Sequence, residues 1–120
     1  MADHTPIFKP GREITLTAGA GITGGKTLIV SDQETVTHAG GVDAKFVGIS
    51  AFDAASGAQV GVISGGVHEL TASGTINDGD LVTTAASGAV AAFSGTTYST
   101  IIGIALADAA NSLVKVKLFR

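Results

Sequence analysis

The stretch closest to a catalytic or binding motif is Ala20-Gly21-Ile22-Thr23-Gly24-Gly25-Lys26-Thr27. Its Gly-Lys-Thr ending resembles a phosphate-binding loop, in which backbone amides and a following helix N-terminus converge on a phosphate. Two features argue against a nucleotide site. Ala20 stands where the motif has its first glycine, and Lys26-Thr27-Leu28-Ile29-Val30 continues as a β-strand pattern. No apolar strand ending in an acid follows to hold magnesium. The segment is therefore predicted to be a turn.

Three other sets of residues have types that occur in chemical sites. Asn77-Asp78-Gly79-Asp80 lacks the earlier acid and the later glutamate of a calcium loop, so a tight turn explains it. Val62-Ile63-Ser64-Gly65-Gly66 lacks the first glycine and the following helix of a nucleophile elbow. His4, His38 and His68 show no short ligand spacing, and we interpret each as a surface residue. We predict no catalytic, cofactor-binding or metal-binding residue, and hence no enzyme.

The composition excludes several classes of protein. The chain has 120 residues, enough for one domain, and a formal net charge of −3, whereas a nucleic-acid-binding protein needs a basic face. Without cysteine it has neither disulfides nor thiolate zinc sites. No run approaches the roughly 18 apolar residues of a membrane span, and Met1–Pro6 lacks the regions of a secretory signal. We expect neither nucleic acid nor a membrane as partner, and synthesis in a reducing cytoplasm.

The low charge content indicates a protein partner. Only 14% of the residues are charged, and a sparsely charged surface is typical of one that is partly covered in an assembly.

From residue 13 onward the chain alternates short β-patterns with Gly, Asn, Asp and Ser. It is predicted to be all-β, a compact single-domain barrel or sandwich over residues 13–120. A short helix over Ala105–Leu113 is the alternative there, because alanine favours helix. The predicted strands are Glu13–Ala18, Lys26–Ser31, Glu34–Thr37, Phe46–Phe52, Gln59–Ser64, Val67–Ala72, Asp80–Thr84, Ala89–Phe93, Thr100–Ala107 and Ser112–Phe119.

An internal repeat organises these strands. Leu16-Thr17-Ala18 recurs 54 residues later as Leu70-Thr71-Ala72. The spacing is 55 where Gly48-Ile49 matches Gly103-Ile104, and it returns to 54 towards the end. The repeat predicts two pseudo-symmetric β half-units packed about a pseudo-twofold axis, which would hide the free edges of each. Chance identity in an Ala-, Gly- and Thr-rich sequence is the alternative. Further matches are Ile22 with Ile76, Gly25 with Gly79, Val36 with Val90, Asp53 with Asp108 and Val60 with Val114.

Residues 1–12 are predicted to be an extended N-terminal arm. They contain both prolines of the chain, which favour extended backbone. The arm is either a frayed terminus or a strap that docks on a neighbour. The residues predicted to bind a neighbour are Pro6, Ile7, Phe8, Lys9, Pro10 and Arg12.

Several segments resemble the phage capsid cement, or head decoration, proteins over roughly residues 14–119. They are residues 46–57, residues 66–74 with the specific Gly66-Val67-His68-Glu69-Leu70, residues 76–82, residues 102–105 and residues 114–118. The resemblance implies clamps on the outside of an icosahedral head, without catalytic residues or cofactors. Such proteins form homotrimers at threefold and quasi-threefold positions, where they bridge major capsid protein subunits after expansion.

The resemblance also implies a location on the outer capsid surface of the virion, after synthesis in the bacterial host cytoplasm. Two other functions are the alternatives to capsid cement. Another non-enzymatic virion or surface β-module, such as a tail or fibre component, would equally lack chemistry. A ligand-binding accessory β-barrel would need a concave pocket with convergent polar groups, and the sequence marks out no such cluster.

Overall fold

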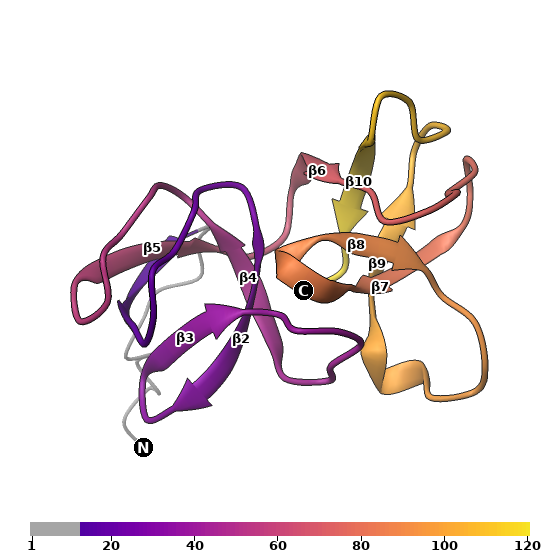
Figure 1. The fold of residues 1–120 in the computed structure, drawn as a ribbon. Helices are drawn as coiled ribbons and strands as arrows, with labels where there is room; N and C mark the ends of the chain where they lie inside the picture. The colour runs from indigo at the N-terminus through magenta and orange to yellow at the C-terminus, as the bar shows by residue number, and fades with distance from the viewer. Residues whose placement is uncertain (1–12) are drawn as a thin grey trace, which may run out of the picture.

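The computed structural model describes residues 13–120, which form ten strands and two short 3-10 helices (Figure 1). Each predicted strand is present, with ends differing by a few residues, so the all-β prediction is confirmed. The alternative helix over Ala105–Leu113 is wrong, because that segment is the loop between the last two strands. Within residues 13–120, no helix is long and apolar enough to cross a membrane. The elements are β1 Glu13–Ala18, β2 Thr27–Asp32, β3 Thr35–His38, β4 Phe46–Ser50, β5 Gln59–Ile63, β6 Val67–Thr71, β7 Leu81–Thr84, η1 Ala86–Gly88, β8 Val90–Ala92, η2 Tyr98–Thr100, β9 Ile101–Ala105 and β10 Leu113–Leu118.

The first half of the chain closes into a barrel in the order β1-β3-β2-β4-β5. Alternate side chains of its strands point inward, as the period of two along a strand requires. Closure pairs all strands, so few backbone groups are left at free edges. The barrel core consists of Leu16, Ala18, Ile22, Leu28, Val36, Val60 and Val62.

The second half forms a five-stranded sheet in the order β6-β10-β9-β7-β8. A parallel bridge between Ala72 and Val90 links its two outer strands. The first barrel has the same contact, where Ala18 pairs in parallel with Val36. The second half is therefore a less completely paired version of the first.

Strand registers confirm the internal repeat. Leu16 lies opposite Val60 in the first half, and Leu70 lies opposite Val114 in the second. The shift in register between β2 and β4 recurs at the equivalent place between β7 and β9. Register shifts of this kind are specific local features, so two unrelated halves would not share one.

Matched glycines also occupy equivalent places. Gly25 and Gly79 both have positive φ, at 78° and 82°, and their amides donate to the carbonyls of Ser50 and Ala105. A Cβ on Gly48 would overlap the carbonyl oxygen of Ile63, and a Cβ on Gly103 would overlap that of Lys117. Close approach of the neighbouring strand therefore requires glycine at both positions.

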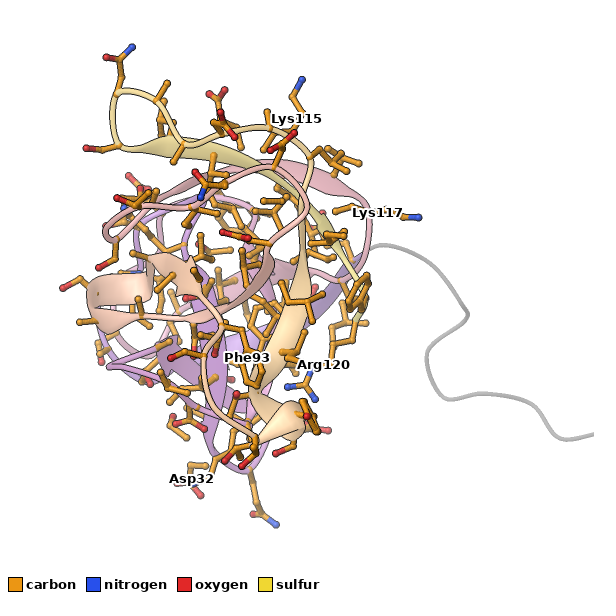
Figure 2. The ribbon with its side chains drawn as sticks, turned by 90° about the vertical axis from the view of Figure 1, so that its right-hand side faces the viewer. Asp32, Phe93, Lys115, Lys117 and Arg120 are labelled. Carbon is orange, nitrogen blue, oxygen red and sulfur yellow. The ribbon has the colours of Figure 1, made fainter. Side chains whose placement is uncertain are left out.

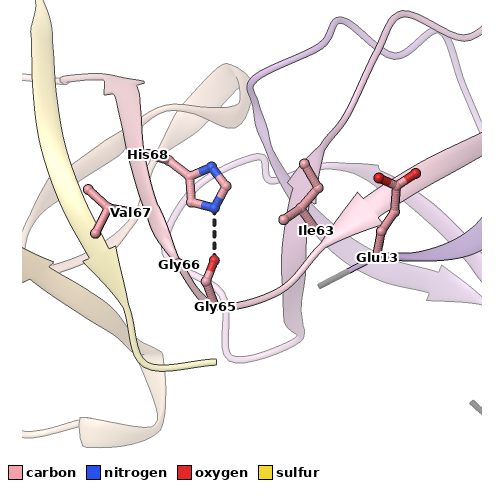
Figure 3. Close-up of a pocket in the computed structure, with 6 residues that line it drawn as sticks. All are labelled: Glu13, Ile63, Gly65, Gly66, Val67 and His68. Atoms are coloured by element: carbon pink, nitrogen blue, oxygen red, sulfur yellow. Dashed lines mark hydrogen bonds between the residues drawn. The ribbon is translucent and has the colours of Figure 1, made fainter. Parts of the chain in front are cut away.

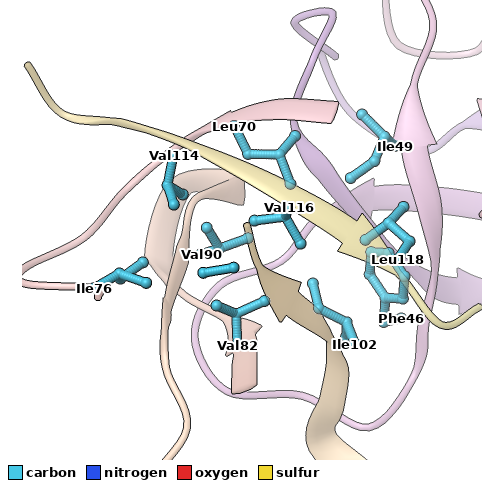
Figure 4. Packing of buried hydrophobic residues seen from close by; sticks show 11 residues of the cluster. Phe46, Ile49, Leu70, Ile76, Val82, Val90, Ile102, Val114, Val116 and Leu118 are labelled. Carbon is cyan, nitrogen blue, oxygen red and sulfur yellow. The ribbon is translucent and has the colours of Figure 1, made fainter. Parts of the chain in front are cut away.

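The two halves share one hydrophobic cluster. Phe46 and Ile49 of β4 pack among second-half residues that include Leu70, Ile102 and Leu118 (Figure 4). Both first-half side chains are less than 10% exposed. Arg120 extends the contact, with its guanidinium carbon 5.9 Å from the centre of the Phe46 ring. The shared core makes the two halves a single domain.

The predicted pseudo-twofold axis is wrong, because the halves meet through different faces. A twofold relation makes an interface self-complementary, so both members of each matched pair would be buried. Thr27 is fully buried and its hydroxyl donates to the carbonyl of Ala89, whereas the matched Leu81 is 37% exposed. The repeat is therefore arranged head to tail.

Gly48→Ala and Gly103→Ala should each lower the free energy of unfolding by about 1–3 kcal/mol, the usual cost of overpacking a core. Gly21→Ala is the matched control, since an added Cβ there meets nothing within 4 Å. Urea denaturation measures all three variants. Equal stability of Gly48→Ala and Gly21→Ala would contradict the packing described here.

Candidate functional site

The loop that resembles a phosphate-binding motif is occupied by contacts within the chain. The amide of Gly24 donates to Asp53 Oδ1 at 2.7 Å, and the amide of Lys26 donates to Ser50 Oγ at 3.0 Å. Lys26 Nζ donates to Thr71 Oγ1 in the second half. An internal carboxylate thus lies where a phosphate would be held, and strand β2 follows in place of a helix. The prediction of a turn is confirmed.

The equivalent turn of the second half uses the same device. The amide of Asp78 donates to Asp108 Oδ1 at 2.8 Å, matching the bond between Gly24 and Asp53. The amide of Asn77 donates to Asp80 Oδ2 at 2.9 Å, as in turns closed by an aspartate. These carboxylates cap backbone amides, and residues 13–120 contain no group of three His, Cys, Asp or Glu that could hold a metal ion.

His38, His68 and Ser64 lie in separate parts of the strands and turns. His38 Nε2 accepts a hydrogen bond from the amide of Thr23, and His68 Nε2 lies 2.8 Å from the carbonyl oxygen of Gly65. Ser64 lies in the short connection between β5 and β6, with no helix after it. The structure does not bring these residues together into a catalytic arrangement.

A hollow of about 350 Å³ lies at the junction of the two halves (Figure 3). Gly65 and Gly66 of the connection form part of its lining, beside Glu13 at the start of β1 and Ile63 at the end of β5. Figure 3 shows the Glu13 carboxylate and the His68 ring on opposite sides of the hollow. They do not converge on one point, so the hollow lacks the arrangement of a ligand site.

The six predicted neighbour-binding residues, Pro6, Ile7, Phe8, Lys9, Pro10 and Arg12, lie outside the residues that the structure describes. Their role stays a prediction.

Sequence reasoning missed an exposed row of side chains across the second half. Val67 of β6 lies opposite Lys117 of β10, Lys117 lies opposite Ile104 of β9, and Ile104 lies opposite Leu81 of β7. Directly opposed residues point to the same side of a sheet, so these four side chains form one row, which we call the outer row of the second half. Figure 2 shows Lys117 extending outward from this half.

Three of the four side chains of the outer row are apolar, and Lys117 lies between Val67 and Ile104. Val67 is 54% exposed and Leu81 is 37% exposed. Six of the nine large apolar side chains exposed within residues 13–120 belong to the second half. Exposed apolar side chains on one face of a sheet favour an interaction site. The outer row could have been found from the register of β6, β10, β9 and β7. The sequence indicates that register only through the internal repeat.

A model of the phage cement proteins matches residues 8–118 of this chain. The chain belongs to the phage cement protein family. The resemblance to that family is therefore confirmed. The family is one of structural proteins of the phage virion. No curated protein matches the chain.

Among solved structures, this cement protein is similar to the head fiber gp8.5 N base in bacteriophage phi29. The TM-score is 0.64 with 21% sequence identity, over 88% of this chain and 92% of that chain. At that identity the likeness shows a shared fold alone.

Addition of ATP and magnesium should leave the melting temperature of this cement protein unchanged. A ligand that binds only the native state must raise it, and the amide of Gly24 is already bonded to Asp53. Differential scanning fluorimetry tests this over a range of nucleotide concentrations. A saturable rise that disappears in Lys26→Ala would show that the loop binds phosphate.

Proposed function

We propose that this cement protein binds the outer surface of the expanded icosahedral head and bridges neighbouring major capsid protein subunits. The match of the family model to residues 8–118 carries the proposal. The shared core of the two halves supports it, because a rigid body transmits force between the subunits that it joins. The role is structural, without catalysis or cofactor.

The proposed assembly is a homotrimer at threefold and quasi-threefold positions. Many identical weak contacts then act together, and avidity lets the coat persist although each contact is modest. The outer row of the second half supports self-association, since it leaves apolar side chains in water. The protein would be made in the bacterial host cytoplasm and would reach the virion after the head expands.

The N-terminal residues are proposed to hold a neighbouring subunit. Ile7 and Phe8 are apolar, and burying each is worth roughly 1.5–3 kcal/mol before entropic costs. Pro6 and Pro10 restrict the backbone, which lowers the entropy lost on binding. Lys9 and Arg12 would add weaker, salt-sensitive contacts to acidic capsid surface.

The base of a head fibre is a second candidate function. The observation that favours it is the shared fold with a head fiber base. A fibre base would support a projection away from the head, whereas a clamp between capsid subunits would not. Cryo-electron microscopy of particles distinguishes the two by whether density continues outward from this domain.

Purified protein should bind expanded heads that lack it and raise the temperature at which they release DNA. Unexpanded heads serve as the control, since their subunits are arranged differently. Co-sedimentation gives occupancy, and a dye-release assay gives the temperature. Equal binding to both forms of head, or no change in release temperature, would contradict the cement function.

Deletion of residues 1–10 should weaken attachment to expanded heads while leaving the melting temperature nearly unchanged, because β1 begins at Glu13. Ile7→Ala with Phe8→Ala should reproduce the loss, and Thr5→Ala should not. Occupancy is measured by co-sedimentation over a concentration series. Unchanged affinity after deletion would mean that these residues are only a frayed end.

A further inference from the structure

The first half has an outer row equivalent to that of the second. Glu13 lies opposite Ile63, Ile63 opposite Ile49, and Ile49 opposite Thr27. By the repeat, these residues match Val67, Lys117, Ile104 and Leu81. The same row of positions thus exists twice in one chain, and its surroundings can be compared directly.

One end of the first row is covered by the second half. Thr27 is fully buried and Ile49 is 2% exposed. At the matched end of the second row, Leu81 is 37% exposed and Ile104 is half-buried. Phe93, which matches the buried Ala39, is likewise half-buried. Figure 2 views the second half from the side away from the first half, with Phe93 near the centre.

Thr27, at the end of the first row, is covered by the connection between β7 and β8. The carbonyl of Ala89 accepts from the Thr27 hydroxyl at 3.3 Å, and the amide of Gly88 donates to the carbonyl of Ala39 at 3.0 Å. Gly88 also lies directly against Lys26, since a Cβ there would be 2.7 Å from Lys26 Cβ. This connection is one part of the contact surface of the second half, beside the cluster that receives Phe46 and Ile49.

The first half carries the equivalent connection, uncovered. It is the β2–β3 hairpin, residues 30–36, whose tip at residues 31–34 is exposed. Glu34 matches Gly88, and both have positive φ, 47° and 73°. The two connections hold matched places in the repeat but differ in backbone, because the β7–β8 connection has a second positive φ at Ser87 and forms η1. Within residues 13–120, each chain therefore presents one uncovered receiving face and one uncovered connection at the place that matches the segment filling it.

We infer that a second copy of this chain docks its β2–β3 hairpin on the Leu81–Ile104 end of the second half. The contact repeats between chains the part of the internal contact that the β7–β8 connection makes. It is heterologous, and heterologous contacts form a ring when the rotation closes. Three chains would place six half-units in such a ring. The inference names the surface of the proposed homotrimer and rests on that proposal for its ring size.

The charges make this contact weaker than its counterpart within the chain. Lys26 is matched by Asp80, and Gly88 is matched by Glu34. Docking would therefore bring two carboxylates together where the chain itself places a lysine beside a glycine. Salt screens exposed like charges, so self-association should strengthen as sodium chloride is added. If the contact were instead held by opposite charges, self-association would weaken as sodium chloride is added.

Paired cysteines test the contact, because the chain has none of its own. Thr35→Cys with Leu81→Cys places thiols at the positions matching Ala89 and Thr27, which touch within the chain. Thr35→Cys with Leu113→Cys is the matched control, since Leu113 is 41% exposed and lies outside the row. A short bismaleimide is applied to concentrated protein in high salt and to decorated heads.

We expect covalent dimers and larger species from the Leu81 pair at several times the yield of the Leu113 pair. Because each chain would make two links, a closed ring appears as one discrete largest species. Leu81→Asp should weaken self-association by at least about tenfold, since it would bury an unpaired charge, whereas Leu113→Asp should have no effect. Circular dichroism checks that both variants fold.

Equal cross-linking of the two pairs, or none in solution and on heads, would overturn the inference. Heads that bind the protein without a Leu81-specific cross-link would overturn it and leave the cement function standing. If the protein forms cross-linked rings but does not bind expanded heads, the inference stands and the cement function is overturned.

Discussion

The insertion of Phe46 and Ile49 into the cluster of the second half is the interaction on which the rest of the structure depends. A five-stranded unit of about fifty residues buries too little apolar surface to be securely stable by itself. Packing β4 of the first half against Leu70, Ile102 and Leu118 joins two such units around one core. Core phenylalanines typically contribute about 3–5 kcal/mol when compared with alanine, a large part of the stability of a small domain.

Duplication followed by head-to-tail packing has a consequence that a twofold arrangement lacks. A twofold interface uses the same patch on both halves, so neither half keeps an unpaired copy of that patch. Here the first half receives and the second half covers, so residues 13–120 retain one exposed face of either kind. Side chains at matched positions have diverged accordingly. The covered row has Thr27 where the uncovered row has Leu81, and Lys26 is replaced by Asp80.

The motifs that resemble chemistry serve the architecture of the turns. Asp53 and Asp108 each accept a hydrogen bond from a backbone amide of a glycine-containing turn. A charge-assisted bond of this kind satisfies a donor that would otherwise need water. Lys26 reaches across to Thr71 and ties the halves together. A sequence similar to a phosphate-binding loop can therefore arise from the needs of a tight turn alone.

The strands, the repeat and the turns could be predicted from the sequence, because they depend on local alternation and on residues such as Gly25 and Gly79 that permit positive φ. The family resemblance could be recognised in the same way. Which faces of the two halves meet could not be predicted and is known from the folded molecule. Thr27 and Leu81 hold matched positions with similar local patterns, yet one is buried and the other is exposed. That difference comes from long-range packing, which periodicity along the chain does not encode, so the predicted twofold axis failed and the outer row went unseen.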